Sequence, residues 1–318
     1  MSRTSFPRRR EPRRRHAVFL IPAFAGMTLL ALLAFLTSAF AAQFSFAAFG
    51  DTPYNAAEEL LIPGMMAEMD RETLAFTIHV GDFKNPRSEC SDALYRQRRD
   101  LFAQSRHPFV FIPGDNDWLD CGRARRARDP LERLGKLRDV FFAADATLGQ
   151  KRLAVERQAK RGYPEHLRWI AEGIVFATLN VPGHTNNAGA AESTPRTAAA
   201  IDWMREAFRL ARERKLPGVV IALHADLWIG HTGYDSILAA LAEEALRYGG
   251  AVLVVHGDTH WFRFDQPLVD PQSGKKVDNV TRLEVFGSPF VNWTLVTVSV
   301  ENGKARFSAR MGGQAGAR

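Results

Sequence analysis

The feature that most constrains the fold is a short apolar segment ending in Gly-Asp, which occurs four times in this chain of 318 residues. Each segment is rich in β-branched or aromatic residues and stops at the glycine, as is typical of a strand buried on both faces. In open α/β sheets such strand ends meet at one edge, where sites are built. The four aspartates and their segments are Asp51 after Phe44–Phe49, Asp82 after Phe76–Val80, Asp115 after Phe109–Pro113 and Asp258 after Ala251–His256.

Four carboxylates at one sheet edge repel one another, because burying unpaired charge is strongly unfavourable. A cation between them removes that cost, so the pattern predicts a metal centre. Two imidazoles stand at matching places. His224 ends the strand-like segment Val219–Leu223, and His260 follows Asp258 by one intervening residue.

The order of these motifs resembles that of the calcineurin-like metallophosphoesterases, the superfamily that includes the purple acid phosphatases. Their signature runs Asp-x-His, Gly-Asp, Gly-Asn-His-Glu/Asp, a strand-terminal His and Gly-His-x-His. The matching order extends over roughly residues 44–262. The resemblance implies an α/β fold, a four-layer α/β/β/α sandwich of two mixed β-sheets flanked by helices.

The resemblance also implies a dinuclear centre in which Asp82 bridges two metal ions. The first ion would be held by Asp51, Asp82 and His260, and the second by Asp82, Asp115, His224 and Asp258. Such cations, about 3.5–4 Å apart, convert water to hydroxide that attacks phosphorus, which predicts hydrolysis of phosphate mono- or diesters. The metals expected are Mn, Fe, Zn or Mg. Four carboxylates with two imidazoles favour Mn²⁺, Fe or Mg²⁺ over an all-zinc site.

The chain departs from the family pattern at three positions. Pro53 stands where Asp-x-His has its histidine, Asn116 where Gly-Asn-His has its histidine, and Asp258 where Gly-His-x-His has its first histidine. Asn116 can donate a hydrogen bond but cannot deliver a proton. Two alternatives therefore stay open. One is a catalytically degenerate exported relative that binds metal, phosphate or a partner, and the other is an unrelated doubly wound binding protein, in which the aspartates would lie apart.

Two loop histidines are candidates to replace the missing acid, His231 and His184, although an ordinary loop histidine is the plainer interpretation of each. Asn116 itself is counted with them as a catalytic candidate. Further residues close to the motifs are expected to line the pocket or support the ligands. These are Tyr54, Asn85, Asp117 and His256.

The isoelectric point near 9.7 results from the amino terminus. Residues 1–15 hold seven Arg and one Glu and residues 16–42 hold no charged residue, which leaves a net charge of about +1 for residues 43–318. Bulk charge therefore argues against a nucleic-acid partner. We expect a small phosphorylated substrate, and the oligomeric state is open.

Residues 1–42 are predicted to be a signal peptide, with Ala39-Phe40-Ala41 as the cleavage pattern. An uncleaved membrane anchor is the alternative, because the apolar stretch from Ala17 to Phe40 is long. In either case residues 43–318 are read as one exported metallophosphoesterase-like domain, periplasmic or secreted.

Export affects the interpretation of the two cysteines. Cys90 and Cys121 lie on the loops that follow Asp82 and Asp115, and an oxidising compartment favours a disulfide over two free thiols. Three further expectations concern local structure. Arg123 to Arg128 is a solvated loop, Pro182–Pro195 is a loop, and Thr281–Phe286 is an antiparallel strand.

Overall fold

The computed structural model describes Met1, residues 42–230 and residues 232–313. Nearly all of the predicted leader (1–42) and the candidate His231 lie outside the described residues, so both stay predictions. Among the helices of the described part of the chain, none combines the length and the apolar character of a membrane span.

Five strands form the first sheet, in the order β12-β11-β1-β2-β3. Its centre is parallel, because β1 pairs with β2 and β2 with β3 in the same direction, while β11 and β12 are antiparallel to their neighbours. The strands are β1 (Ala42–Phe49), β2 (Thr77–His79), β3 (Phe109–Phe111), β11 (Thr294–Glu301) and β12 (Lys304–Met311).

Seven strands form the second sheet, in the order β4-β5-β6-β7-β8-β10-β9. Strands β6, β7, β8 and β10 are parallel, and the two edges are antiparallel. The strands are β4 (Glu156–Gln158), β5 (Tyr163–Ala171), β6 (Ile174–Thr178), β7 (Gly218–Ala222), β8 (Ala251–His256), β9 (Arg263–Asp265) and β10 (Val280–Glu284).

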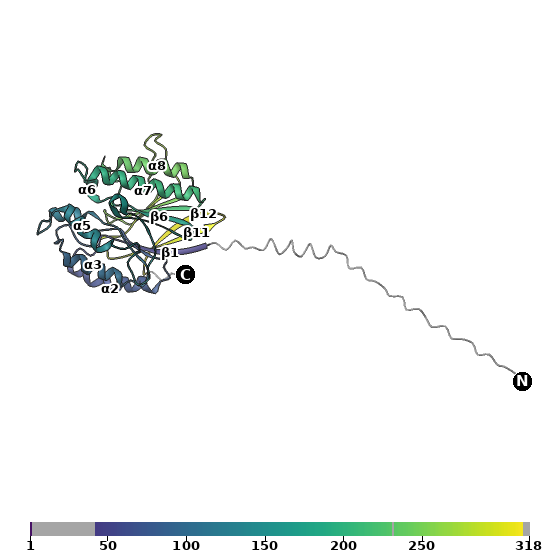
Figure 1. The fold of residues 1–318 in the computed structure, drawn as a ribbon, viewed down its shortest axis with the longest axis horizontal. Coiled ribbons are helices and arrows are strands. Elements are labelled where there is room, and N and C mark those ends of the chain that lie inside the picture. The colour runs from purple at the N-terminus through teal and green to yellow at the C-terminus, as the bar shows by residue number, and fades with distance from the viewer. Residues whose placement is uncertain (2–41, 231, 314–318) are drawn as a thin grey trace. The chain divides into compact units, whose positions relative to one another are not determined.

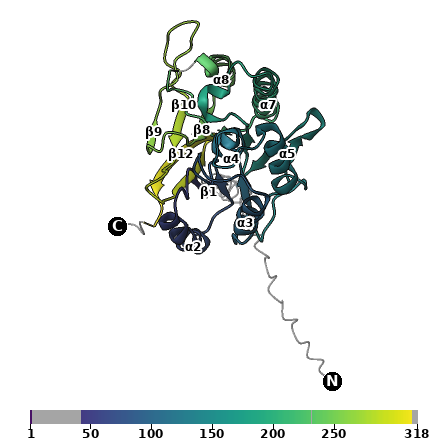
Figure 2. The same ribbon diagram turned by 90° about the vertical axis from the view of Figure 1, so that its left-hand side faces the viewer.

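Helices cover the outer face of each sheet (Figures 1 and 2). One group lies against the first sheet and another, at the top of Figure 1, against the second. The first group is α2 (Ala56–Arg71), α3 (Asp92–Ala103) and α5 (Pro130–Phe141), and the second is α7 (Ser193–Glu213) and α8 (Asp235–Tyr248). Two short turns, α4 (Asp115–Trp118) and α6 (Gly183–Asn186), lie in the loops. The predicted four-layer fold is confirmed.

The two sheets meet through aromatic side chains. The ring of Phe176 on β6 lies 5.5 Å from that of Phe46 on β1 and 4.9 Å from that of Phe76, which also contacts Trp169 at 5.3 Å. Such edge-to-face contacts add to the free energy gained by burying large apolar surfaces. This layer fixes one sheet against the other.

Strands β6, β7 and β8 are buried on both faces, as their continuous apolar sequences predict. On β7, Val220 and Ala222 belong to the core between the sheets, whereas Val219 and Ile221 belong to the core under α7 and α8. This alternation follows from the two-residue period of a strand. Both faces therefore restrain the strand whose end carries His224.

Two local expectations were wrong. The strand predicted over Thr281–Phe286 is β10, which runs parallel to β8 and is antiparallel only to the short edge strand β9. The loop predicted over Pro182–Pro195 ends earlier, because α7 begins at Ser193. Alternation of apolar residues indicates a strand but does not indicate its direction, which depends on the partner.

His166 on β5 predicts a pH dependence of stability. Burial lowers the pKa of this imidazole from 6.5 to about 4, and its Nδ1 lies 2.7 Å from Gln158 Oε1. Because the folded pKa is depressed, the neutral ring contributes stability above pH 6.5, and this contribution is lost as the pH falls toward 4. Between pH 6.5 and pH 4 we expect the free energy of unfolding of the unmodified protein to fall by about 3 kcal/mol more than that of His166→Asn. The same pH dependence of the free energy of unfolding in both proteins, measured by chemical denaturation, would contradict this prediction.

Candidate metal centre

The predicted ligands converge at the carboxyl ends of strands from both sheets. Asp51, Asp82 and Asp115 follow β1, β2 and β3, whereas His224 and Asp258 follow β7 and β8. His260 lies in the loop between β8 and β9. Asp51, Asp82, Asp115 and His224 are buried, and Asp258 and His260 are partly exposed. The reading in which the aspartates lie apart is wrong.

His224 lies at the centre of this cluster. Its Nε2 is 2.9 Å from Asp115 Oδ1, 3.6 Å from Asp82 Oδ2 and 3.9 Å from Asp258 Oδ1. Two groups of side chains each offer ligand atoms within 4.8 Å of one another, Asp51 with Asp82 and His224, and Asp115 with His224 and Asp258. His224 thus faces both predicted metal positions, whereas it was assigned to one.

His260 lies at the edge of the same cluster, with its Nε2 3.6 Å from Asp51 Oδ1. The other ring nitrogen of each histidine faces a backbone carbonyl. His260 Nδ1 is 2.7 Å from the Ser288 oxygen, and His224 Nδ1 is 2.9 Å from the Val80 oxygen. A carbonyl only accepts hydrogen bonds, so each Nδ1 carries a proton, and each Nε2 is the ring nitrogen directed into the cluster. This is the arrangement of metal-binding histidines in proteins.

The electrostatics of the cluster favour a bound cation. Burial raises the pKa of Asp51 from 3.8 to about 8, and it also raises the pKa values of Asp82 and Asp258. Burial alone would lower the pKa of His224, but the charge of Asp82 and the hydrogen bond to Asp115 raise it well above 6.5. The carboxylates therefore attract positive charge to their centre, and these oxygen and nitrogen donors fit a metal ion.

The backbone at the ligands is held in an unfavourable conformation. Asp51, Asp82, Asp258 and His260 have φ values of 52°, 61°, 79° and 65°, in the left-handed region that non-glycine residues rarely adopt. Such residues persist only where the surrounding structure fixes them, and they cluster at functional sites.

The glycines of the repeated Gly-Asp motif make room for the carboxylates. A Cβ atom on Gly114 would lie 2.0 Å from Asp82 Oδ1, and one on Gly257 would lie 2.1 Å from Asp51 Oδ2. No side chain fits at these distances. At both positions glycine is required because any side chain would occupy the space of a carboxylate that follows a different strand.

A hydroxyl links Asp82 to Asn116. The Tyr54 hydroxyl donates to Asp82 Oδ2 at 2.9 Å and accepts from Asn116 Nδ2 at 2.9 Å, and the Asn116 backbone N–H donates to Asp82 Oδ1 at 2.9 Å. Asn85 Nδ2 donates to the Tyr54 carbonyl at 2.6 Å. Tyr54 and Asn116 thus lie at the cluster, and Asn85 lies one residue behind it.

Asp117 and His256 lie behind the predicted ligands. The Asp117 carboxylate accepts from the backbone N–H groups of Asp82, Phe83 and Gly114 at 2.8–3.0 Å, so it holds two Gly-Asp loops together. His256 is buried, its Nδ1 is 2.9 Å from the Gly257 oxygen, and burial lowers its pKa to about 4. These positions agree with a supporting place for both residues.

His184 projects from a turn at the rim of the cluster. Residues 184–187 have φ values of 51–58°, a left-handed turn of four non-glycine residues. The Arg196 guanidinium holds it by donating to the side chain and carbonyl of Asn186. His184 Nε2 accepts from the Arg123 guanidinium, which also pairs with Asp120. Ligand atoms of Asp115, Asp120 and His184 lie within 4.8 Å of one another.

Several residues around the centre were missed by the sequence analysis. Glu58 accepts from Tyr54 N–H and the Ser288 hydroxyl, and thereby holds the carbonyl that orients His260. Asp226 donates its backbone N–H to Asp258 Oδ2. Arg123 lies in the exposed loop that the sequence predicts, but its contacts with Asp120 and His184 were not predicted. The predicted disulfide between Cys90 and Cys121 is present.

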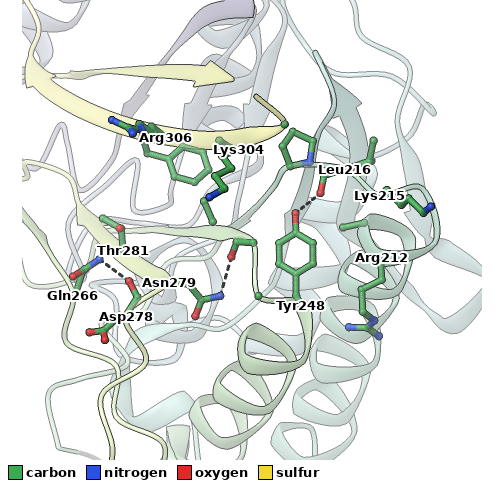
Figure 3. A pocket seen from close by; sticks show the side chains of 18 residues that line it. Arg212, Lys215, Leu216, Tyr248, Gln266, Asp278, Asn279, Thr281, Lys304 and Arg306 are labelled. Carbon is green, nitrogen blue, oxygen red and sulfur yellow. Dashed lines mark hydrogen bonds between the residues drawn. The ribbon is translucent and has the colours of Figure 1, made fainter. Parts of the chain in front are cut away.

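A separate cavity of about 760 Å³ lies at the amino ends of β7 and β8 (Figure 3). Tyr248 and Asn279 line it and bond to the backbone carbonyls of Leu216 and Gly250. Lys304 and Arg306 also line it. None of the predicted site residues does.

No protein-family model matches the chain, and no curated protein matches it. Among solved structures, a 5'-nucleotidase from Candida albicans is 12% identical over 84% of this chain, with a TM-score of 0.45. Vps29 from Chaetomium thermophilum is 10% identical and zinc-bound Vps29 from Entamoeba histolytica is 8% identical, each over 84% of the chain, with TM-scores of 0.28 and 0.26.

The chain spans 51% of the length of the nucleotidase and 95% and 98% of the two Vps29 proteins. These proteins have the calcineurin-like metallophosphoesterase fold. The motifs of this chain resemble the signature motifs of that superfamily. The likeness concerns the fold alone.

The space beside Gly114 can be tested by Gly114→Ala. The added methyl group would displace Asp82 Oδ1, so we expect metal content measured by elemental analysis to fall clearly below that of the unmodified protein. The matched control is Gly135→Ala in α5, where nothing lies within 4 Å of the added atom and the helix gains up to about 1 kcal/mol. Full metal content in both variants would contradict the packing argument.

Proposed function

We propose that the chain is a metal-dependent phosphoesterase that hydrolyses phosphate mono- or diesters at a dinuclear metal centre. The observation that carries the proposal is the convergence on one buried cluster of four strand-end aspartates and two histidines whose Nε2 atoms face inward. The structure has buried Asp and His groups able to bind metal, and hydrolysis is the inference drawn from them.

Two metal ions are proposed, held by the ligand set inferred from the sequence. Those ligands are Asp51, Asp82, Asp115, His224, Asp258 and His260. When bound, the ions would supply an activated water as nucleophile and would neutralise charge on the phosphoryl oxygens. The oxygen-rich donor set supports Mn²⁺, Fe or Mg²⁺ over an all-zinc site.

The remaining polar groups have roles toward the substrate. The Asn116 amide has two N–H donors, of which one is directed to the Tyr54 hydroxyl, and the second is left for a phosphoryl oxygen. At the rim, His184 Nε2 accepts from Arg123 and therefore carries no proton in this arrangement. His184 and Arg123 are better suited to holding an anion than to protonating a leaving group.

A second candidate function, binding of metal or phosphate without turnover, is favoured by Asn116. An amide cannot give a proton to a leaving alkoxide, and Tyr54 already donates its hydroxyl proton to Asp82. Esters with good leaving groups need no such proton. Hydrolysis of an ester with a good leaving group therefore distinguishes the two functions, because only the phosphoesterase turns it over.

We further propose that the domain is exported, periplasmic or secreted, and that its substrate is a small phosphorylated molecule. The Cys90–Cys121 disulfide supports an oxidising compartment. The near-neutral charge of residues 43–318 argues against a nucleic-acid partner. A membrane partner would follow only from an uncleaved amino-terminal segment.

The proposal predicts that residues 43–318 bind about two metal ions per chain and hydrolyse p-nitrophenyl phosphate or its bis-ester with added Mn²⁺, Zn²⁺ or Fe. In Asp82→Asn we expect turnover to fall more than about 100-fold, beyond the loss typical of a residue that only supports a ligand. Elemental analysis and initial rates measure both quantities.

The matched control is Asp202→Asn on the exposed side of α7, where the aspartate pairs with Arg161. This variant should keep both metal and activity. Metal without turnover of either ester would favour the binding function, and no metal under any condition would refute the dinuclear centre.

A further inference from the structure

We propose that a pocket beside the metal centre binds a second phosphate group of the substrate, so that the preferred substrates are phosphoesters carrying another phosphate. This inference rests on the proposed function and names its substrate class. The pocket, called here the arginine pocket, has a volume of about 660 Å³ and is lined by Asn85, Arg87, Ser88, Glu89, Arg123 and Arg125.

The two loops that form the arginine pocket are fixed to each other. The Cys90–Cys121 disulfide joins them, and the Arg125 N–H donates to the Arg87 carbonyl at 3.1 Å. Asn85 Oδ1 accepts from the N–H groups of Arg87 and Ser88 at 2.9 Å each. The backbone is therefore ordered before a ligand arrives, which lowers the entropic cost of binding.

The charge of the arginine pocket is positive and largely uncompensated. Arg87 and Arg125 are exposed, and no carboxylate of the described residues lies within ion-pair distance of either. Glu89, the acid of the lining, pairs with Arg126 at 3.5 Å. Two positively charged side chains that line one pocket without a carboxylate partner favour an anion there. Guanidinium groups match phosphate by paired hydrogen bonds, and a phosphate dianion suits several of them.

Two short chains of contacts connect the arginine pocket to the metal centre. On one side, Asn85 bonds to the Tyr54 carbonyl, and the Tyr54 hydroxyl bonds to Asp82. On the other side, Arg123 bonds to His184, which lies beside Asp115. On each side, one residue separates the pocket from the predicted ligands. We therefore infer that a small molecule with its phosphoester at the metal centre can also reach the pocket.

The position of Arg123 also argues against a further metal ion at Asp115, Asp120 and His184. Its guanidinium pairs with Asp120 and donates to His184 Nε2, so a cation there would meet a fixed positive charge and an occupied nitrogen. The attraction for the second phosphate comes from Arg87 and Arg125, which have no such partner among the described residues. The rim therefore separates a cation-binding cluster from an anion-binding pocket.

The test measures binding, which needs no turnover. The full chain loaded with Mn²⁺ is titrated calorimetrically with linear alkane bisphosphonates of increasing length and with alkyl monophosphonates of matched length. At the best length we expect the bisphosphonate to bind about 10- to 100-fold more tightly, the range for a charged hydrogen-bonded group. In the double variant Arg87→Ala/Arg125→Ala this advantage should be lost.

The matched control removes the same number of positive charges from the cavity of Figure 3, by Lys304→Ala/Arg306→Ala, and should keep the advantage. Equal binding of both ligands at every length, or an advantage that survives Arg87→Ala/Arg125→Ala, would overturn the proposal. A phosphonocarboxylate that binds as tightly as the bisphosphonate would overturn the assignment to phosphate. Absence of ester hydrolysis would refute the proposed function but not this inference, because the tighter binding of the bisphosphonate is measured without turnover.

Discussion

The interaction on which the rest of the structure depends is the repulsion among buried carboxylates around His224. Four aspartates from two sheets lie within reach of one imidazole, and burial raises the pKa values of Asp51, Asp82 and Asp258. Such a cluster persists in a folded protein when positive charge lies at its centre. The left-handed backbone at Asp51, Asp82, Asp258 and His260 and the tightly packed Gly114 and Gly257 all lie at this cluster.

The free energy that holds this strained arrangement comes from elsewhere in the molecule. The aromatic layer of Phe46, Phe76 and Phe176 fixes the two sheets against each other, and β7 is packed on both faces. Close-packed interiors deform little, so strand ends emerging from them are rigid. The disulfide and the Asp117 carboxylate extend that rigidity into the Gly-Asp loops.

The convergence of the four aspartates could be predicted because each follows an apolar strand and a glycine in the sequence. The supports could not, because they join positions far apart in the sequence. Glu58 holds Ser288, which orients His260, across 230 residues, and nothing near Glu58 indicates that partner. The direction of β10 was misjudged for the same reason, since direction depends on β8. The exposed loop of Arg123 was predicted, but its contact with His184, 61 residues away, was not.

The departures from the family pattern are connected by one hydroxyl. Tyr54 follows Pro53, donates to Asp82 and accepts from Asn116, so the residues beside two missing histidines are joined in a single hydrogen-bonded chain. A chain of this kind constrains its members together, because removing one leaves a buried polar group without a partner. Tyr54 thus connects Asn116 to the segment that contains Pro53, so two departures from the family pattern meet at one side of the predicted centre. With Asp258 in place of a histidine, the predicted donor set is also richer in oxygen, and Arg123 contacts His184 at its rim.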